Sequence, residues 1–378
     1  MGKRNMMRKL CAVMLLAVLI SGCAGGKPPR DTYMRATTFS HLPGWGNDNY
    51  LAALKSFQGS CRVFAKYNGD RPISKLTDIG GSAALWHEPC NEALSHAIFT
   101  NQQARKFFEK WFAPYEVADQ SGSHTGKFTG YYEIILHGSR KKTKHYKYPV
   151  YGPPRNLEDI KGSSCISRTA INKGSLAGKG LEIAWVDNEA RLFFMQIQGS
   201  GMILLPDGKH MKLGYAGQNG YDYTAIGPLF KNYCHDKIRS ADQMMAWMHK
   251  HPKVGKEIME NNQSYVFFKE QGDGPIGGQG VPLIPERSIA IDHGLYPYGT
   301  PVWLATTLPH TNHHHKHGYH RLVVAQDTGG AIKGAVRADV FFGRGHRAEE
   351  LAGSMNQTGS YFMLFPRKAS IPRHYQSK

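Results

Sequence analysis

Two aspartates beside glycine-rich turns form the densest polar group in the sequence. Asp327 follows an apolar run at 322–325 and precedes a pair of glycines, so we expect it where a strand ends and a turn begins. Asp339 lies inside a second apolar run, where strand alternation places it on one face with Arg337 and Phe341. Partial burial beside an aromatic ring raises the pKa of a carboxyl and lets it keep a proton near neutral pH. This pattern predicts a general acid at Asp339.

A second interpretation of the same residues needs no catalysis. Asp327 would then be a turn residue, and Asp339 would form an ion pair with Arg337 or Arg344. Composition alone favours this structural interpretation.

The elements that must position these aspartates are mostly short strands separated by Gly and Pro turns. Periodicity predicts an all-β region over 127–215 and a small barrel near the C-terminus. The expected strands are 128–136, 148–151, 181–186, 191–197, 202–205, 288–291, 302–305, 322–326 and 336–342. The expected helices are 49–57, 101–112, 240–249 and 346–351.

The N-terminus predicts export and lipidation. Four basic residues precede an apolar run at 10–20, which is shorter than a membrane-spanning helix. The run ends in Ser21-Gly22-Cys23, which is typical of a bacterial lipobox. We therefore predict a signal peptide over 1–22, a lipid on Cys23 and a flexible tether over 23–40, with an ordinary secretion signal as the alternative. Ala24, where an aspartate would favour retention in the inner membrane, indicates the periplasmic face of the outer membrane.

The charge indicates an anionic partner. The whole chain has 47 Lys and Arg against 29 Asp and Glu, a formal charge of +18. Residues 1–22 contain four of the basic residues and no acidic ones, so the mature chain keeps a formal charge of +14. For an exported protein, this excess favours an acidic cell-wall polymer over nucleic acid.

The cysteines fit an oxidising compartment. Apart from Cys11 in the signal and Cys23, the sequence has four cysteines, which permit three pairings. We favour Cys61–Cys90 because it closes a loop within one segment. No CxxC pair is present, and the histidines between His310 and His320 are interpreted as an exposed loop, not a metal site. The sequence thus predicts neither a metal nor another cofactor.

An ordered series of short motifs resembles the membrane-bound lytic murein transglycosylase A (MltA) family. Three aspartates, Asp292, Asp327 and Asp339, match its C-terminal three-aspartate domain. The other matches are FTGYYE at 128–133, QGSG at 198–201, YAG at 215–217 with NG at 219–220, SYVFF at 264–268 and GTPV at 299–302. Together they cover about residues 45–365.

The resemblance implies a mainly β fold with some helix. It implies a double-psi β-barrel domain, formed by 41–130 and 265–378, with a second β-rich domain inserted at 131–264 and a groove between the two. In such a fold the catalytic aspartate belongs to the C-terminal part of the barrel domain.

The resemblance also implies a reaction. This is cleavage of the β-1,4 bond between N-acetylmuramic acid and N-acetylglucosamine in peptidoglycan, which leaves 1,6-anhydromuramoyl ends. Asp339 matches the single catalytic acid and base, Asp327 is expected to support it, and Asp292 is expected to be structural. The alternatives are a non-catalytic peptidoglycan-binding lipoprotein and a β-glycan hydrolase that uses Asp327 and Asp339 as a carboxylate pair.

Five further residues are expected to bind the glycan strand. Gln198, Ser200 and Gly201 offer polar groups and bare backbone to the sugars, and Tyr131 and Tyr215 offer ring faces. The family commonly has lysine where this chain has Gln218, which would change affinity for peptide carboxylates rather than the reaction.

Overall fold

The computed structural model describes residues 32–95, 97–155, 166–233, 238, 240–272, 274–310 and 317–376. The expected signal peptide, Cys23 and the start of the expected tether lie outside these ranges. So do Cys165, Cys234 and the middle of the histidine-rich loop. Within the described ranges, no helix has the length and apolar character needed to cross a bilayer.

Strands and helices alternate irregularly along the chain. The strands are β1 (Tyr33–Ala36), β2 (Phe112–Ala118), β3 (Gly126–Ser139), β4 (Tyr148–Tyr151), β5 (Glu182–Val186), β6 (Ser200–Leu204), β7 (His210–Gln218), β8 (Val266–Glu270), β9 (Ser288–Ile291), β10 (Pro301–Thr307), β11 (Gly318–Asp327), β12 (Arg337–Arg344) and β13 (Asn356–Pro366). The helices are α1 (Tyr50–Phe64), α2 (Ala84–Leu94), α3 (Asn101–Trp111), α4 (Arg168–Asn172), α5 (Glu189–Gln198), α6 (Phe230–Tyr233), α7 (Ala241–Lys250), α8 (Pro252–Glu260) and α9 (His346–Ser354).

Six of the strands close into a barrel. Their order is β13, β10, β11, β9, β12, β3 and again β13. The β9–β11 and β3–β12 pairs are parallel, and the other pairs in this ring are antiparallel. The mainly β class with some helix is confirmed, and the closed ring agrees with the barrel expected from the sequence.

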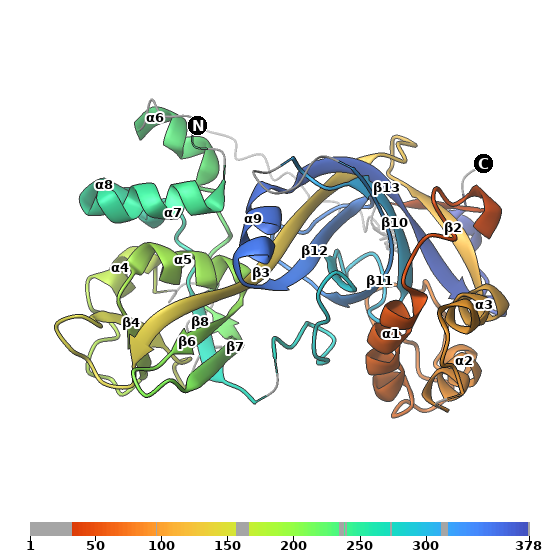
Figure 1. Cartoon of the computed structure of the whole chain (residues 1–378), viewed down its shortest axis with the longest axis horizontal. Coiled ribbons are helices and arrows are strands. Elements are labelled where there is room, and N and C mark those ends of the chain that lie inside the picture. The colour runs from red at the N-terminus through yellow and green to blue at the C-terminus, as the bar shows by residue number, and fades with distance from the viewer. Residues whose placement is uncertain are drawn as a thin grey trace, which may run out of the picture. The chain divides into compact units, whose positions relative to one another are not determined.

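Strand β3 belongs to two sheets. Its first part pairs with β12 from Lys127 to Glu133, and its next part pairs with β6 from Ile134 to His137. Strands β7 and β8 extend this second sheet beyond β6, as Figure 1 shows. One continuous strand therefore fixes the register of the barrel against the register of the second sheet.

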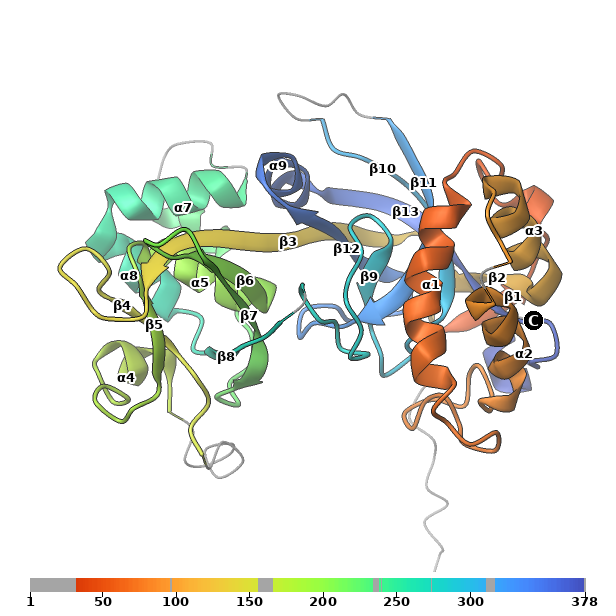
Figure 2. The same ribbon diagram turned by 60° about the horizontal axis from the view of Figure 1, so that its bottom comes forward.

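Helices α1, α2 and α3 pack beside the barrel, with α1 against β11 (Figure 2). Their core is aromatic: the rings of Phe57 and Phe112 meet edge to face at 5.5 Å. A disulfide joins Cys61 in α1 to Cys90 in α2, the pairing favoured from the sequence, with Cα atoms 5.0 Å apart. This bond ties the two helices together beside the barrel.

Residues 191–197 form helix α5, so the strand expected there is wrong, and 127–215 is not an all-β region. The helix begins at the N-cap Asn188, whose side chain accepts a hydrogen bond from the amide of Arg191. It ends at Gly199, whose φ of +78° is the left-handed conformation of a helix C-cap. The caps and the packing of α5 against β3 and α7 outweigh the β-prone run of apolar residues.

The expected tether over 23–40 is also too long. Residues Tyr33–Ala36 form β1, which pairs with β2 in antiparallel register. The Thr32 hydroxyl hydrogen-bonds to that of Tyr296 at 2.5 Å, and Met34 is buried. These contacts place the chain from residue 32 onward in one compact unit, which spans Asp31–Lys378.

Candidate active site

Four side chains in register across neighbouring strands form the centre of the site. Asp327 of β11 and Asp339 of β12 are both paired with Ala290 of β9, and Asp339 is paired on its other side with Thr129 of β3. Residues directly opposite each other on paired strands point to the same face. The two aspartates therefore share one face, separated by one strand and a small alanine side chain, or about 10 Å of backbone at ~4.8 Å per strand.

Asp339 is partly exposed and makes one strong hydrogen bond. The hydroxyl of Thr129 donates to its Oδ1 at 2.6 Å, and the guanidinium of Arg337 donates to that hydroxyl oxygen at 2.9 Å. Within the described residues, nothing donates to Oδ2. Burial raises the pKa of Asp339 to about 6, although the hydrogen bond from Thr129 and the charge of Arg337 act in the opposite direction.

Asp327 has both carboxylate oxygens occupied. The phenol of Tyr131 donates to Oδ2 at 2.7 Å, and the amides of Gly278 and Thr328 donate to Oδ1 at 2.8 and 2.9 Å. Burial raises the pKa of Asp327, and these three donors, which stabilise the carboxylate, oppose that rise. Asp327 therefore joins β11, β3 and the 278 loop beside Asp339.

An apolar cluster lies next to the aspartates on the same face. Tyr131 lies two residues beyond Thr129 in β3, and Phe341 lies two residues beyond Asp339 in β12. Their rings pack with centroids 5.2 Å apart. Leu283, Ala290 and Ile332 complete the cluster. The ring of Tyr131 is only 7% exposed, so it desolvates the carboxyls while its hydroxyl holds Asp327.

Asp292, the third matched aspartate, lies just beyond the end of β9 and contacts neither of the others. Its Oδ2 accepts a hydrogen bond from the amide of Gly334 at 3.0 Å. Its Oδ1 accepts from the amide of Gly294 at 3.2 Å and from Lys333 at 3.3 Å. These bonds tie the turn that leads into β12 to the end of β9.

Three of the expected glycan-binding residues lie where α5 passes into β6. The side-chain oxygen of Gln198 accepts a hydrogen bond from the amide of Tyr132 at 3.0 Å, which ties this junction to β3. Ser200 and Gly201 are buried at the start of β6. A Cβ added at Gly201 would come within 2.3 Å of the sulfur of Met195, so this close approach requires glycine.

Tyr215 and Gln218 lie on β7, two strands away from β3 in the second sheet. The side chain of Tyr215 is 52% exposed. Gln218 accepts a hydrogen bond from the hydroxyl of Ser264 at 3.2 Å. The structure therefore brings Tyr131 together with the two aspartates and places Tyr215 further along the second sheet.

Sequence reasoning missed Thr129. The residue lies inside the FTGYYE motif, but strand alternation within β3 does not reveal which strand pairs with it. The structure shows a parallel pairing with β12 that sets Thr129 opposite Asp339. The sequence alone could have identified Thr129 as a partner of Asp339 only if this strand register had been known.

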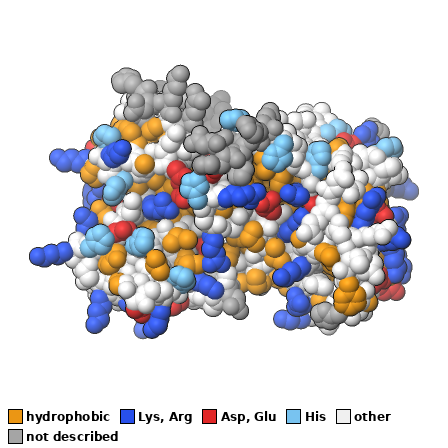
Figure 3. Space-filling view, in the orientation of Figure 1, with side chains coloured by type: hydrophobic (Ala, Val, Ile, Leu, Met, Phe, Trp, Pro, Cys, Tyr) orange, Lys and Arg blue, Asp and Glu red, His pale blue; other side chains and the backbone are white. Residues whose placement is uncertain are grey.

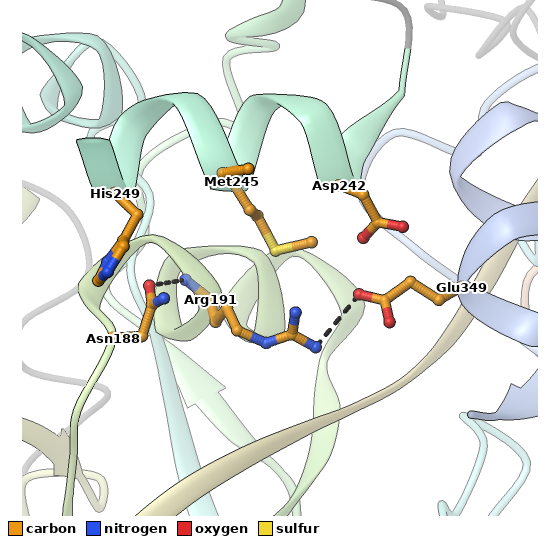
Figure 4. A pocket seen from close by; sticks show the side chains of 7 residues that line it. Asn188, Arg191, Asp242, Met245, His249 and Glu349 are labelled. Carbon is orange, nitrogen blue, oxygen red and sulfur yellow. Dashed lines mark hydrogen bonds and ion pairs between the residues drawn. The ribbon is translucent and has the colours of Figure 1, made fainter. Parts of the chain in front are cut away.

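A pocket of about 300 Å³ lies across β3 from Asp339. Arg191 from α5, Asp242 and His249 from α7, and Glu349 from α9 line it, with Arg191 and Glu349 paired at 3.1 Å (Figure 4). Tyr132 donates to Glu349 at 3.1 Å and, as the neighbour of Tyr131 in a strand, points to the opposite face. The pocket thus faces away from the two aspartates.

The chain matches two family models. The model described as "MltA specific insert domain" covers residues 127–269, and the "3D domain" model covers 287–365. Asp327 and Asp339 lie in the second match, and Thr129 and Tyr131 lie in the first.

Proteins of known name and structure match nearly the whole chain. The membrane-bound lytic murein transglycosylase A of Vibrio cholerae is 31% identical over 365 residues, 95% of each chain. The crystal structure of a membrane-bound lytic murein transglycosylase from Agrobacterium tumefaciens is 29% identical, with a TM-score of 0.78 over 91% of this chain and 100% of that one. Escherichia coli MltA with bound chitohexaose is 25% identical, with a TM-score of 0.67 over 90% and 96%.

The relative from V. cholerae covers almost all of both chains, and the two family models match successive parts of this chain, 127–269 and 287–365. The chain therefore belongs to the membrane-bound lytic murein transglycosylase A family.

Proposed function

We propose that this protein, a peptidoglycan lytic transglycosylase by family, cleaves the β-1,4 bond between N-acetylmuramic acid and N-acetylglucosamine and leaves 1,6-anhydromuramoyl ends. The observation that carries the proposal is Asp339: a desolvated carboxyl with a pKa of about 6 and one oxygen without a donor among the described residues. A carboxyl with this pKa is protonated in about a tenth of molecules at pH 7, far more often than an ordinary aspartate.

The reaction needs one carboxyl in two successive roles. Protonated Asp339 gives its proton to the glycosidic oxygen as that bond to the anomeric carbon breaks. The sugar left with oxocarbenium character is attacked by its own C6 hydroxyl, and the Asp339 carboxylate takes the hydroxyl proton. No water enters the product, and Asp339 ends the cycle protonated. Thr129 holds Oδ1 throughout, which keeps Oδ2 directed to the substrate.

The occupied oxygens of Asp327 count against a two-carboxylate hydrolase. Such an enzyme needs its second carboxylate to activate water or to attack the anomeric carbon. In Asp327, a phenol and two amides stabilise the carboxylate charge, which makes its oxygens weaker bases and weaker nucleophiles. We assign Asp327 a positioning role beside Asp339.

We propose that the glycan strand lies along the face that carries Asp339 and reaches the residues near β6 and β7. The binding residues would be Tyr131, Gln198, Ser200, Gly201 and Tyr215. Chitohexaose, a β-1,4 oligosaccharide, is bound to the related E. coli protein, which supports a saccharide ligand. Among these residues, Tyr215 has an exposed ring, which suits stacking against a sugar.

The domain division proposed is a barrel domain over 41–130 and 265–378 with an insert at 131–264. The insert model over 127–269 supports it, as does the switch of β3 from β12 to β6 after Glu133. Strand β8, the last strand of the second sheet, ends at Glu270, close to the end of that match.

We further propose that the protein is anchored by a lipid on Cys23 at the periplasmic face of the outer membrane. The relatives are named membrane-bound, and the lipobox sequence supplies a means of attachment. On the face shown in Figure 3, Lys and Arg side chains are spread widely and Asp and Glu side chains are sparse. Such a surface suits peptidoglycan, whose peptide stems carry carboxylates.

The test is mass spectrometry of the fragments that the protein releases from purified sacculi. A transglycosylase leaves muramoyl ends one water lighter than the reducing ends that a hydrolase leaves. The proposal predicts the lighter, anhydro ends. Hydrated ends would indicate the hydrolase, and binding of sacculi without release would indicate a wall-binding lipoprotein; either result overturns the proposal.

A further inference from the structure

A buried carboxylate and a half-exposed arginine form a pair on the face that carries Asp339. The Oε2 of Glu133 lies 3.3 Å from the Nε of Arg344, and the side chains are 1% and 48% exposed. Burial raises the pKa of Glu133, and the positive charges of Arg344 and Lys212 oppose that rise. A buried carboxylate destabilises the fold unless it is paired. The ion pair keeps the Nε edge of the guanidinium beside Glu133.

A β-bulge in β12 brings Arg344 to this face. Phe341 is paired with Tyr131 and Arg344 with Glu133, so two residues of β12 oppose the single Tyr132 of β3. Strict alternation from Asp339 would have sent residue 344 to the opposite face. Gly343 makes the bulge possible: its φ is +88°, and a Cβ there would come within 2.8 Å of Pro285.

Lys212 adds a second cation on the same face. It is paired with Met202 of β6, which is paired with Ile135 of β3, two residues beyond Glu133. Within the described residues, Lys212 has no ion-pair partner, and Arg344 has only Glu133. Since Glu133 contacts the Nε, the two terminal nitrogens of Arg344 remain available to a bidentate acceptor.

We propose that Arg344, fixed by Glu133 and assisted by Lys212, is a subsite for a carboxylate on the peptide stem of the glycan strand. The site lies four β3 residues from the row of Asp339, or ~13 Å along the strand. A fixed guanidinium edge suits a carboxylate, whereas a neutral sugar offers no charge to match it. The inference rests on the proposed function and gives this chain a preference for strands that carry peptides.

The test measures binding in the Asp339→Asn background, so that no cleavage occurs. Three ligands are compared: peptide-bearing strands from sacculi, the same strands after an amidase has removed the stems, and chitohexaose. The second ligand keeps only the lactyl carboxylate, and the third has none. Adding Arg344→Gln should weaken binding of peptide-bearing strands about tenfold, as expected for the loss of one charge-assisted pair. The ratio of affinities for peptide-bearing and stem-free strands should fall to about one.

Arg347→Gln is the matched control, because Arg347 is 51% exposed, pairs with Glu286 at 2.6 Å and lies outside this face in α9. The double variant Glu133→Gln/Arg344→Gln removes both charges, so no buried carboxylate is left unpaired, and it should show the same loss. If Arg344→Gln weakened binding of stem-free strands equally, the site would be assigned to the lactyl carboxylate. If Arg344→Gln did not weaken binding, or if Arg347→Gln weakened it equally, a specific site would be excluded. Each of these results would overturn the proposal. Because cleavage is absent, these outcomes are independent of the product test for the reaction.

Discussion

Asp339 and Asp327 flank the same alanine of β9, and burial raises the pKa of both, yet their hydrogen bonds differ. Asp327 accepts from three donors that hold it as a carboxylate, whereas Asp339 accepts from one hydroxyl. Burial alone does not separate an acid from a structural carboxylate; the number of donors does. The comparison supports our proposal that Asp339 is the group that gains and loses a proton during the reaction.

The largest effect is expected for Asp339→Asn. The amide has no acidic proton to give and cannot act as a base, so the rate of release of anhydro fragments should fall by about 10³-fold or more. The variant should melt at nearly the same temperature as the parent, because Asn fits the same space and can still accept from Thr129. Turnover at the parental rate would remove Asp339 from the chemistry.

Asp327→Asn should have a smaller effect. The amide can accept from only some of the three donors, so Asp339 should lose part of its alignment and the rate should fall about 10–100-fold. Steady-state kinetics on glycan strands measures this change, and Tyr131→Phe, which removes one donor alone, should lie between this variant and the parent. A loss of rate as large as that of Asp339→Asn would indicate that both carboxyls take part in the chemistry, which would contradict a positioning role for Asp327.

Thr129→Val should shift the pH dependence more than the maximum rate. The Thr129 hydroxyl stabilises the ionised form of Asp339 and so lowers its pKa. Without it, the pKa of Asp339 should rise, and activity should persist to higher pH by up to ~1 unit. Thr129→Ser, which keeps the hydroxyl, should behave like the parent; an alkaline limb that does not move in Thr129→Val would contradict the role of this hydrogen bond.

The smallest effect on activity is expected across β3, at Asp242. Burial first, and then the neighbouring Glu349, raise the pKa of Asp242 to about 7, with Arg191 opposing. The folded state thus holds a proton that the unfolded state releases near pH 4, and the free energy of unfolding should fall as pH rises from about 4 to 7. Glu349, whose pKa is lowered, acts in the opposite sense at the acid end of this range.

Asp242→Asn should reduce that loss of stability between about pH 4 and 7 while leaving cleavage unchanged. Urea unfolding at several pH values measures the first, and the release of fragments measures the second. Tyr132, His249 and Glu350 also face or act on this group, so the residual pH dependence of the variant reports their share. A drop in cleavage as large as that of Asp327→Asn would connect the two faces of β3.

Much of the barrel could be predicted from local sequence. The strand at 288–291 coincides with β9, and the capping residues Ser240 and Gln243 fix the start of α7. Helix α5 could not be predicted from periodicity, because its apolar residues also suit a strand; the caps at Asn188 and Gly199 carried the correct signal. Strand β13 was also missed, although it closes the barrel onto β3.

The site divides in the same way. Alternation correctly placed Arg337, Asp339 and Phe341 on one face, because the period of a strand is a local property. It could not place Thr129 opposite Asp339, since that depends on the pairing of strands more than 200 residues apart. Nor could it bring Arg344 to the same face, because the bulge at Gly343 breaks the alternation.

The central claim is that Asp339 donates the proton in the reaction. The pH dependence of kcat/KM for the parent enzyme tests it most directly, because this quantity reports the pKa of the essential acid in the enzyme without substrate. With Asp339 as the acid, kcat/KM should fall as pH rises through about 6, the value to which burial raises its pKa. A value of kcat/KM that rises through pH 6, or that stays constant from pH 5 to 8, would contradict the assignment of Asp339 as the proton donor.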